Sequence, residues 1–247
     1  MRRFASALLI FLVLAPATGC GPSLTRMIVD PSAGSGLLDL GMKSDGPRMD
    51  RFRRIVREGL ASAVLDVPAP DGANLRGMVF EPGDYGLHWS TERDEDGFRF
   101  RFGFDTDSLD RDAVAEAGGT VILPHGLYAT GTRLLPHALS FAERGYRAVL
   151  VDLRAHGGSG GPYVTYGVRE REDLGTVVAT LREQGEPVPP VILFGTSLGG
   201  AVAIQGAATG APADRIVAIA AFADAREPTT ASGPGDCRQA PETAEAT

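Results

Sequence analysis

This 247-residue chain has few cysteines, no excess of positive charge and no long apolar run. Its two cysteines and four histidines form no cluster with metal-site spacing, so the sequence predicts neither a metal nor another cofactor. A formal net charge of −7 argues against nucleic acid as a partner. The apolar stretch from Phe4 to Ala15 falls short of the roughly 20 residues that a membrane-spanning helix needs. The composition, 43% hydrophobic and 22% charged, is that of a chain able to bury a core.

The first 19 residues are typical of a bacterial secretory signal, because two arginines precede the short apolar stretch. Ala17 to Cys20 resembles a lipobox, and cleavage there would leave Cys20 N-terminal and lipidated. The alternative is ordinary cleavage near Ala17. Gly21 is not an acidic inner-membrane retention residue, so we expect a lipid anchor in the outer membrane, on the periplasmic side of the cell envelope. Cys237 would then have no partner for an intramolecular disulfide.

After the signal, composition divides the chain into three parts. Residues 20–45 are rich in Gly, Pro, Ser and Asp and are predicted to be a tether. Residues 46–225 carry the apolar periodicity of a folded domain. Residues 226–247 have almost no large apolar side chain and are predicted to be disordered.

The domain opens with a predicted helix over residues 47–60. The apolar runs 63–67 and 75–80 flank Asp71-Gly72, a combination that predicts an antiparallel hairpin. Residues 81–97 are polar and are predicted to form a loop.

Four phenylalanines alternate with arginine and glycine at positions 98, 100, 102 and 104, which places their rings on one face of a strand. A core-facing strand is the favoured interpretation, and an aromatic platform for a ligand is the alternative.

From residue 119 onward, apolar runs alternate with helical patterns. This order predicts an α/β fold with a mostly parallel sheet and helices on both faces. The predicted strands cover 120–123, 147–151, 191–194 and 216–222, and the predicted helices cover 134–144, about 174–185 and 198–208.

Gly195-Thr196-Ser197-Leu198-Gly199 lies between a predicted buried strand and a predicted helix. A serine at that position needs a sharp, strained turn, and Gly195 and Gly199 supply the room for it. The start of the helix adds a positive dipole end beside the hydroxyl of Ser197. An N-capping serine in a glycine-rich turn is the structural alternative.

Two further motifs follow strands earlier in the chain. Pro124-His125-Gly126-Leu127 can direct a backbone amide toward the same oxygen as the amide of Leu198, so that the two form an oxyanion hole. His125 is predicted to be a structural hydrogen-bonding residue, because it precedes the serine. The segment from Asp152 to Gly160 is predicted to be an architectural loop rather than a catalytic one, with Asp152 and Arg154 paired locally.

In this order, the three motifs resemble those of the α/β-hydrolase superfamily, especially its serine-aminopeptidase-like and monoglyceride-lipase-like members. The segment from Tyr166 to Leu174 is similar to the helix that precedes the elbow strand in those members. The resemblance implies an α/β-hydrolase fold, Ser197 as the nucleophile, and the amides of Leu127 and Leu198 as the oxyanion hole.

The family places its catalytic acid and then its histidine after the nucleophile. Here all four histidines precede Ser197, and Asp224 is only a weak candidate for the acid, since a solvated loop residue is the alternative. We therefore expect a fold that is incomplete at its C-terminus, from a truncated or frame-shifted form of a longer lipoprotein.

The leading hypothesis is a serine hydrolase that acts on carboxylic esters or related small acyl substrates through a Ser197 acyl-enzyme. A peptidase of the same fold is one alternative, and an inactive fragment or pseudoenzyme is the other. The oligomeric state is left open by the sequence.

Overall fold

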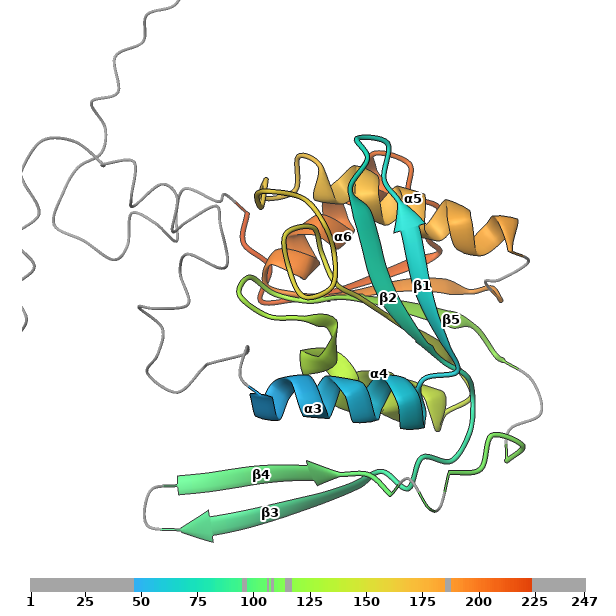
Figure 1. Ribbon diagram of the computed structural model, residues 1–247, viewed down its shortest axis with the longest axis vertical. Coiled ribbons are helices and arrows are strands. Elements are labelled where there is room, and N and C mark those ends of the chain that lie inside the picture. The colour runs from blue at the N-terminus through green and yellow to red at the C-terminus, as the bar shows by residue number, and fades with distance from the viewer. Residues whose placement is uncertain are drawn as a thin grey trace, which may run out of the picture.

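A computed structural model describes residues 47–223 of the chain, except 95–96, 106, 108, 114–116 and 185–187. Within this part lies a six-stranded sheet of order β1-β2-β6-β5-β7-β8, together with a separate two-stranded sheet (Figure 1). The predicted signal, the tether and the predicted C-terminal tail lie outside the described residues, and so do Cys20 and Asp224. Among the described residues, no helix is long and apolar enough to cross a membrane.

The chain enters the fold through α3 (Pro47–Ile55), which continues into one π-helical segment, η1 (Val56–Leu60). The hairpin β1 (Ala63–Pro68) and β2 (Asn74–Phe80) follows, and the two strands are antiparallel as predicted. Gly72 occupies the turn at φ 86°, in the left-handed region that favours glycine. β2 then pairs antiparallel with β6, so the hairpin extends one edge of the main sheet.

The predicted loop over 81–97 is wrong in its second half, because β3 (His88–Asp94) is a strand paired with β4 (Gly97–Gly103). The polar sequence of β3 hides this strand, and pairs such as Trp89 opposite Phe102 hold it, with ring centroids 5.8 Å apart. Phe102 and Phe104 pack partly buried against the core, as the core-facing interpretation predicts. The side chains of Phe98 and Phe100 lie outside the described residues.

The predicted alternation of strands and helices from residue 119 is confirmed. Strands β5, β6, β7 and β8 run parallel to one another, with β5 between β6 and β7. The elements, in chain order, are β5 (Thr120–Pro124), η2 (Gly131–Leu134), α4 (Leu135–Ala142), β6 (Arg147–Val151), α5 (Glu170–Glu183), β7 (Val191–Thr196), α6 (Leu198–Ala208) and β8 (Arg215–Ile219).

Helices cover both faces of the sheet. Side chains along each buried strand point alternately to the two faces, so each strand contributes to two separate cores. On one face, α5 and α6 bury Leu174, Val178 and Val202 against Ile122 and Leu193. On the other face, helices α3 and α4 cover strand side chains that include Val121, Leu123 and Phe194 (Figure 1). The fold is therefore an α/β fold, with a mostly parallel sheet between two helical layers, as predicted.

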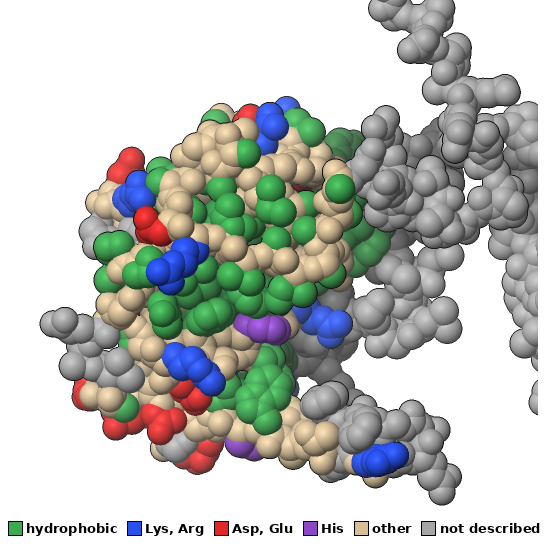
Figure 2. All heavy atoms as spheres, turned by 180° about the vertical axis from the view of Figure 1, so that it is seen from behind, with side chains coloured by type: hydrophobic (Ala, Val, Ile, Leu, Met, Phe, Trp, Pro, Cys, Tyr) green, Lys and Arg blue, Asp and Glu red, His purple; other side chains and the backbone are tan. Residues whose placement is uncertain are grey.

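β8 forms the far edge of the main sheet and ends at Ile219, three residues before the predicted end of the last strand. Ala220 follows at φ 51°, which leaves the extended region and closes the strand. The side chains of Ile216, Val217 and Ile219 are exposed. Apolar side chains gather widely on the back of the molecule (Figure 2).

Candidate active site

Ser197 sits on the sharp turn between β7 and α6 that the sequence predicts. Its backbone adopts φ 51° and ψ −116°, a conformation that L-residues rarely occupy. The Ser197 N–H donates to the carbonyl of Ile219 at 2.8 Å, so β8 helps to hold the strained turn. The side chain is exposed at the first turn of α6, where the dipole of the helix favours a developing negative charge.

The glycines on either side of the serine are required by close backbone contacts. A Cβ on Gly195 would lie 2.2 Å from the carbonyl oxygen of Gly199, and a Cβ on Gly199 would lie 2.1 Å from the carbonyl oxygen of Pro124. Backbone atoms of a buried strand and helix have little freedom to move away from such clashes. The prediction that these glycines supply room for the turn is therefore confirmed.

The loop after β5 reaches the serine. A Cβ on Gly126 would lie 3.3 Å from the Cβ and 3.9 Å from the Oγ of Ser197, so this loop is in direct contact with the elbow. Among the described residues, neither the N–H of Leu127 nor that of Leu198 donates to a protein acceptor. The N–H groups of Leu127 and Leu198 therefore remain as two backbone donors, one on each of the two segments that meet beside the hydroxyl of Ser197.

His125 is fully buried, and both of its ring nitrogens are engaged. Nε2 accepts from the Leu153 N–H at 3.0 Å, and Nδ1 lies 2.7 Å from the carbonyl oxygen of Gly126, to which it donates. Burial, followed by the neighbouring ring of His156, lowers the pKa of His125 to about 4. This neutral ring ties β5 to the loop after β6, which is the structural role that the sequence predicts.

The other three histidines of the chain also lie within the described residues, and none of them hydrogen bonds to Ser197. His156 is buried beside His125, with ring centroids 4.9 Å apart. Its Nδ1 donates to the Arg154 carbonyl oxygen at 2.8 Å. His137 is exposed on α4 against Phe194, and His88 lies on the separate hairpin. Within the described part of the chain, no histidine therefore hydrogen bonds to the serine.

The loop from Asp152 to Gly160 is held by hydrogen bonds between side chains and backbone groups. The Asp152 carboxylate accepts from the N–H of Gly131 at 2.7 Å and from the N–H of Gly158 at 2.8 Å. The Ser159 hydroxyl donates to the carbonyl of Asp152 at 2.6 Å. These contacts agree with the architectural interpretation of this loop.

The predicted local pair between Asp152 and Arg154 is wrong. Arg154 instead donates two hydrogen bonds to Asp173 on α5, at 2.7 and 2.6 Å, and a third to Asp71 in the β1–β2 turn at 2.9 Å. The side chains of Arg154 and Asp173 are only 3% and 4% exposed. Because the partners are 19 and 83 residues away in the sequence, local spacing gave no signal for this network.

Glu170, at the start of α5, is a further buried acid that the sequence does not single out. Its carboxylate accepts from the Thr165 and Gly167 N–H groups at 2.6 and 2.7 Å. These bonds fix the turn that carries Tyr166, whose ring packs on Phe222 beyond the end of β8. Burial raises the pKa of Tyr166 to about 12.

The remaining predicted site residues are not placed. Asp224 and Cys20 lie outside the described residues, so neither can be compared with the serine. Within the part of the chain that the structure describes, no group of three or more His, Cys, Asp or Glu side chains could hold a metal ion.

The elbow and the loop after β5 both lie within the part of the chain that matches a known family. The model of the family described as serine aminopeptidase, S33, matches residues 115–239, which include both the loop after β5 and the elbow. This chain belongs to the serine aminopeptidase S33 family. It is therefore an α/β hydrolase by family as well as by fold.

Individual relatives are more distant. An uncharacterized protein, YqkD of Bacillus subtilis, is 31% identical over 113 residues, which are 45% of this chain and 37% of that protein. The esterase PF2001 of Pyrococcus furiosus is similar in structure, with a TM-score of 0.46 and 23% identity over 66% of this chain and 51% of the esterase. The α/β hydrolase GrgF of a Penicillium species gives a TM-score of 0.48 and 22% identity over 68% and 51% of the two chains. This S33 family member thus spans about half the length of the solved structures that it resembles and less of YqkD.

Proposed function

We propose that this chain is a serine hydrolase that cleaves carboxylic esters or related small acyl substrates through an acyl-enzyme at Ser197. The observation that carries the proposal is the strained, exposed Ser197, with φ 51°, in contact with the loop of Gly126. A nucleophile elbow of this kind is expensive to build and is favoured where a hydroxyl has to be presented to a substrate.

In the proposed reaction, the Oγ of Ser197 attacks the substrate carbonyl carbon, and the hydroxyl proton passes to a base. The carbonyl oxygen becomes an oxyanion, which the N–H groups of Leu127 and Leu198 stabilise. Collapse of this intermediate expels the alcohol, which takes up the proton, and leaves an ester between Ser197 and the acyl group. Water then releases the acid and restores the hydroxyl.

The second candidate is a chain that takes up an acyl group slowly or only binds the substrate. It is favoured by the absence, within the described residues, of a histidine bonded to Ser197. Removing one member of a catalytic triad costs on the order of 10⁴ to 10⁶ in rate. A peptidase is the third candidate, because acyl transfer at a serine also cleaves amides.

A fluorophosphonate probe and a panel of substrates distinguish the three candidate functions. We expect the probe to label the wild type and Ser90→Ala, a control on the exposed hairpin strand β3, but not Ser197→Ala. Hydrolysis of short p-nitrophenyl esters without cleavage of aminoacyl p-nitroanilides supports the esterase, and the reverse supports the peptidase. Labelling without turnover of either substrate supports the slow acylation candidate. Equal labelling of Ser197→Ala would refute Ser197 as the nucleophile.

We also propose that the chain is anchored by a lipid on Cys20, on the periplasmic side of the bacterial outer membrane. The support is the lipobox-like Ala17 to Cys20 after a short apolar stretch. In cells fed a labelled fatty acid, the wild type should carry the label and Cys20→Ser should not. Labelling that survives Cys20→Ser would refute the anchor, whatever the activity of Ser197.

A further inference from the structure

Three aromatic residues lie around the start of α6, the helix that follows Ser197. They are Tyr128 in the loop after β5, Tyr166 in the turn before α5, and Phe222 just beyond β8. The ring centroids of Tyr166 and Phe222 are 6.4 Å apart. Burial, followed by the neighbouring phenol of Tyr128, raises the pKa of Tyr166, so the two tyrosines also lie close together. These three residues are called the aromatic cluster below.

Two of the segments that carry the aromatic cluster touch the elbow directly. In the loop after β5, Gly126 lies against Ser197, because a Cβ on this glycine would lie 3.3 Å from the Cβ of the serine. Beyond β8, Ala221 lies against the first turn of α6, because a Cβ on Gly200 would lie 3.1 Å from the Cβ of the alanine. At the left of Figure 1, these two segments and the loop before α5 meet near the start of α6. The aromatic cluster is therefore held close to the nucleophile.

Both tyrosines have a backbone conformation that is unfavourable for a bulky side chain. The φ angle is 56° at Tyr128 and 52° at Tyr166, in the left-handed region that favours glycine. Glycine would form either turn more easily, so the turns themselves do not account for an aromatic side chain at these positions. Strain of this kind persists only where the surrounding contacts enforce it, and it is concentrated at sites that hold ligands.

The turn at Tyr166 is enforced by the buried carboxylate of Glu170. This carboxylate accepts from the N–H and the hydroxyl of Thr165, both at 2.6 Å, and from the N–H of Gly167 at 2.7 Å. The turn also rests on α6, since a Cβ on Gly167 would overlap the side chain of Gln205. These contacts fix the backbone that carries the ring, so less freedom is lost when a ligand binds to it.

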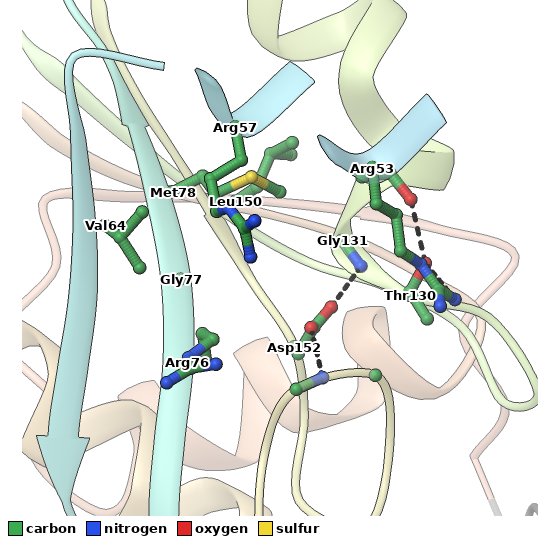
Figure 3. A pocket seen from close by; sticks show the side chains of 13 residues that line it. Arg53, Arg57, Val64, Arg76, Gly77, Met78, Thr130, Gly131, Leu150 and Asp152 are labelled. Atoms are coloured by element: carbon green, nitrogen blue, oxygen red, sulfur yellow. Dashed lines mark hydrogen bonds between the residues drawn. The ribbon is translucent and has the colours of Figure 1, made fainter. Parts of the chain in front are cut away.

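The loop that carries Tyr128 is anchored immediately after the tyrosine. Arg53 of α3 donates to the Thr130 hydroxyl at 3.5 Å, and the Gly131 N–H donates to the Asp152 carboxylate at 2.7 Å (Figure 3). The start of the loop lies against the nucleophile. A short loop that is held at both ends presents its tyrosine from a rigid backbone.

We infer that the aromatic cluster binds an apolar ring of the substrate, beside the carbonyl group that Ser197 attacks. The inference rests on the proposed hydrolysis and adds the chemical class of the group that is recognised. Aromatic side chains bind planar apolar groups through burial of surface and through stacked or edge-to-face contacts. The ring can belong to the acyl part or to the alcohol part of an ester, since both parts adjoin the carbonyl.

The test uses two isomeric esters, benzyl acetate and methyl phenylacetate, which carry the same ring on the alcohol side and on the acyl side. The melting temperature of Ser197→Ala, which lacks the attacking hydroxyl, is measured against the concentration of each ester. Methyl acetate, which has no ring, should bind at least about tenfold more weakly than the better isomer. The isomer that binds more tightly identifies the side of the ring, and equal binding means that the site accepts both.

Variants of the aromatic cluster, made in the same background, assign the binding to its rings. Tyr166→Asn removes a ring, and asparagine tolerates a left-handed backbone, so the turn should be retained. This variant and Phe222→Leu should each weaken binding of the better isomer about three- to tenfold, whereas Tyr166→Phe keeps the ring and should bind nearly as well. Tyr163→Asn is the matched control, because Tyr163 lies in the same loop and is 54% exposed. Circular dichroism checks that each variant is folded.

The inference is overturned if both ring-bearing esters bind no more tightly than methyl acetate, or if neither Tyr166→Asn nor Phe222→Leu weakens their binding. It is also overturned if Tyr163→Asn loses as much binding as these variants. Because binding is measured without the serine hydroxyl, it is independent of the fluorophosphonate labelling. Ring binding in a chain whose Ser197 is never labelled would refute the hydrolysis and leave the aromatic cluster as a binding site.

Discussion

Replacement of Arg154 by methionine tests the buried network between the β1–β2 turn and α5. The two side chains of the Arg154–Asp173 pair are 3% and 4% exposed. Methionine fills much of the arginine volume but leaves the Asp173 carboxylate without its two hydrogen bonds, at 2.7 and 2.6 Å. Breaking a buried pair on one side costs about 3 to 5 kcal/mol of unfolding free energy.

The loss should depend on pH in a defined direction. Burial already raises the pKa of Asp173 above its ordinary value of 3.8, although Arg154 opposes the shift. Without the arginine, the pKa of Asp173 in the folded state rises further, so the folded protein binds a proton more tightly than the unfolded chain does. The destabilisation is then largest near pH 8 and shrinks as the pH falls toward that raised pKa.

Urea unfolding followed by circular dichroism at pH 8 and pH 5 measures both effects. Arg76→Met is the matched control, because its pair with Asp66 is exposed on both sides and should contribute little to stability. The double variant Arg154→Met/Asp173→Leu should recover much of the stability lost in Arg154→Met, since no unpaired charge remains. A loss below about 1 kcal/mol for Arg154→Met, or one that grows toward pH 5, would refute the reasoning.

Three further predictions follow from the core and the elbow. Because the pKa of His125 falls from 6.5 to about 4 on folding, its contribution to stability should be complete above pH 7 and fall by about 3 kcal/mol between pH 6.5 and pH 4. Replacement of His125 by asparagine should remove this part of the pH dependence in urea unfolding, and an unchanged pH dependence would contradict it. Gly199→Ala places a methyl group 2.1 Å from the Pro124 carbonyl oxygen, so it should abolish fluorophosphonate labelling and lower the melting temperature, whereas Gly175→Ala, with no atom within 4 Å, should do neither. Leu139→Ala removes a fully buried side chain of α4 and should cost about 2 to 5 kcal/mol in urea unfolding; a loss like that of an exposed-site variant such as Val168→Ala would contradict the packing.

Periodicity was sufficient to predict the main sheet, because buried parallel strands such as Val191–Thr196 are short apolar runs between turn signals. It failed for β3, where only Trp89 is a large apolar residue and the strand exists through its pairing with β4. Side-chain pairing of that kind is not visible in the sequence of either strand alone.

In the candidate site, too, some features could be predicted from the sequence and others could not. The turn at Ser197 was predictable because Gly195 and Gly199 each lie two residues from it in the sequence, although the close contact of Gly199 is with Pro124 on another strand. The partners of Arg154 were not predictable, because Asp173 and Asp71 lie 19 and 83 residues from it in the chain. Such sites are defined by the tertiary fold, and no short motif encodes them.

The position of β2 between β1 and β6 has a consequence for synthesis of the chain. Phe80 ends β2 and pairs with Ala148, yet every residue between them must be made before this edge of the hairpin can be covered. At about 5 to 20 residues per second, the ribosome needs roughly 3 to 14 s for that interval. During this time the nascent hairpin presents an unsatisfied row of backbone donors and acceptors, the kind of surface to which other extended chains add. The hairpin is thus open to such additions during translation, well before the serine itself has been made.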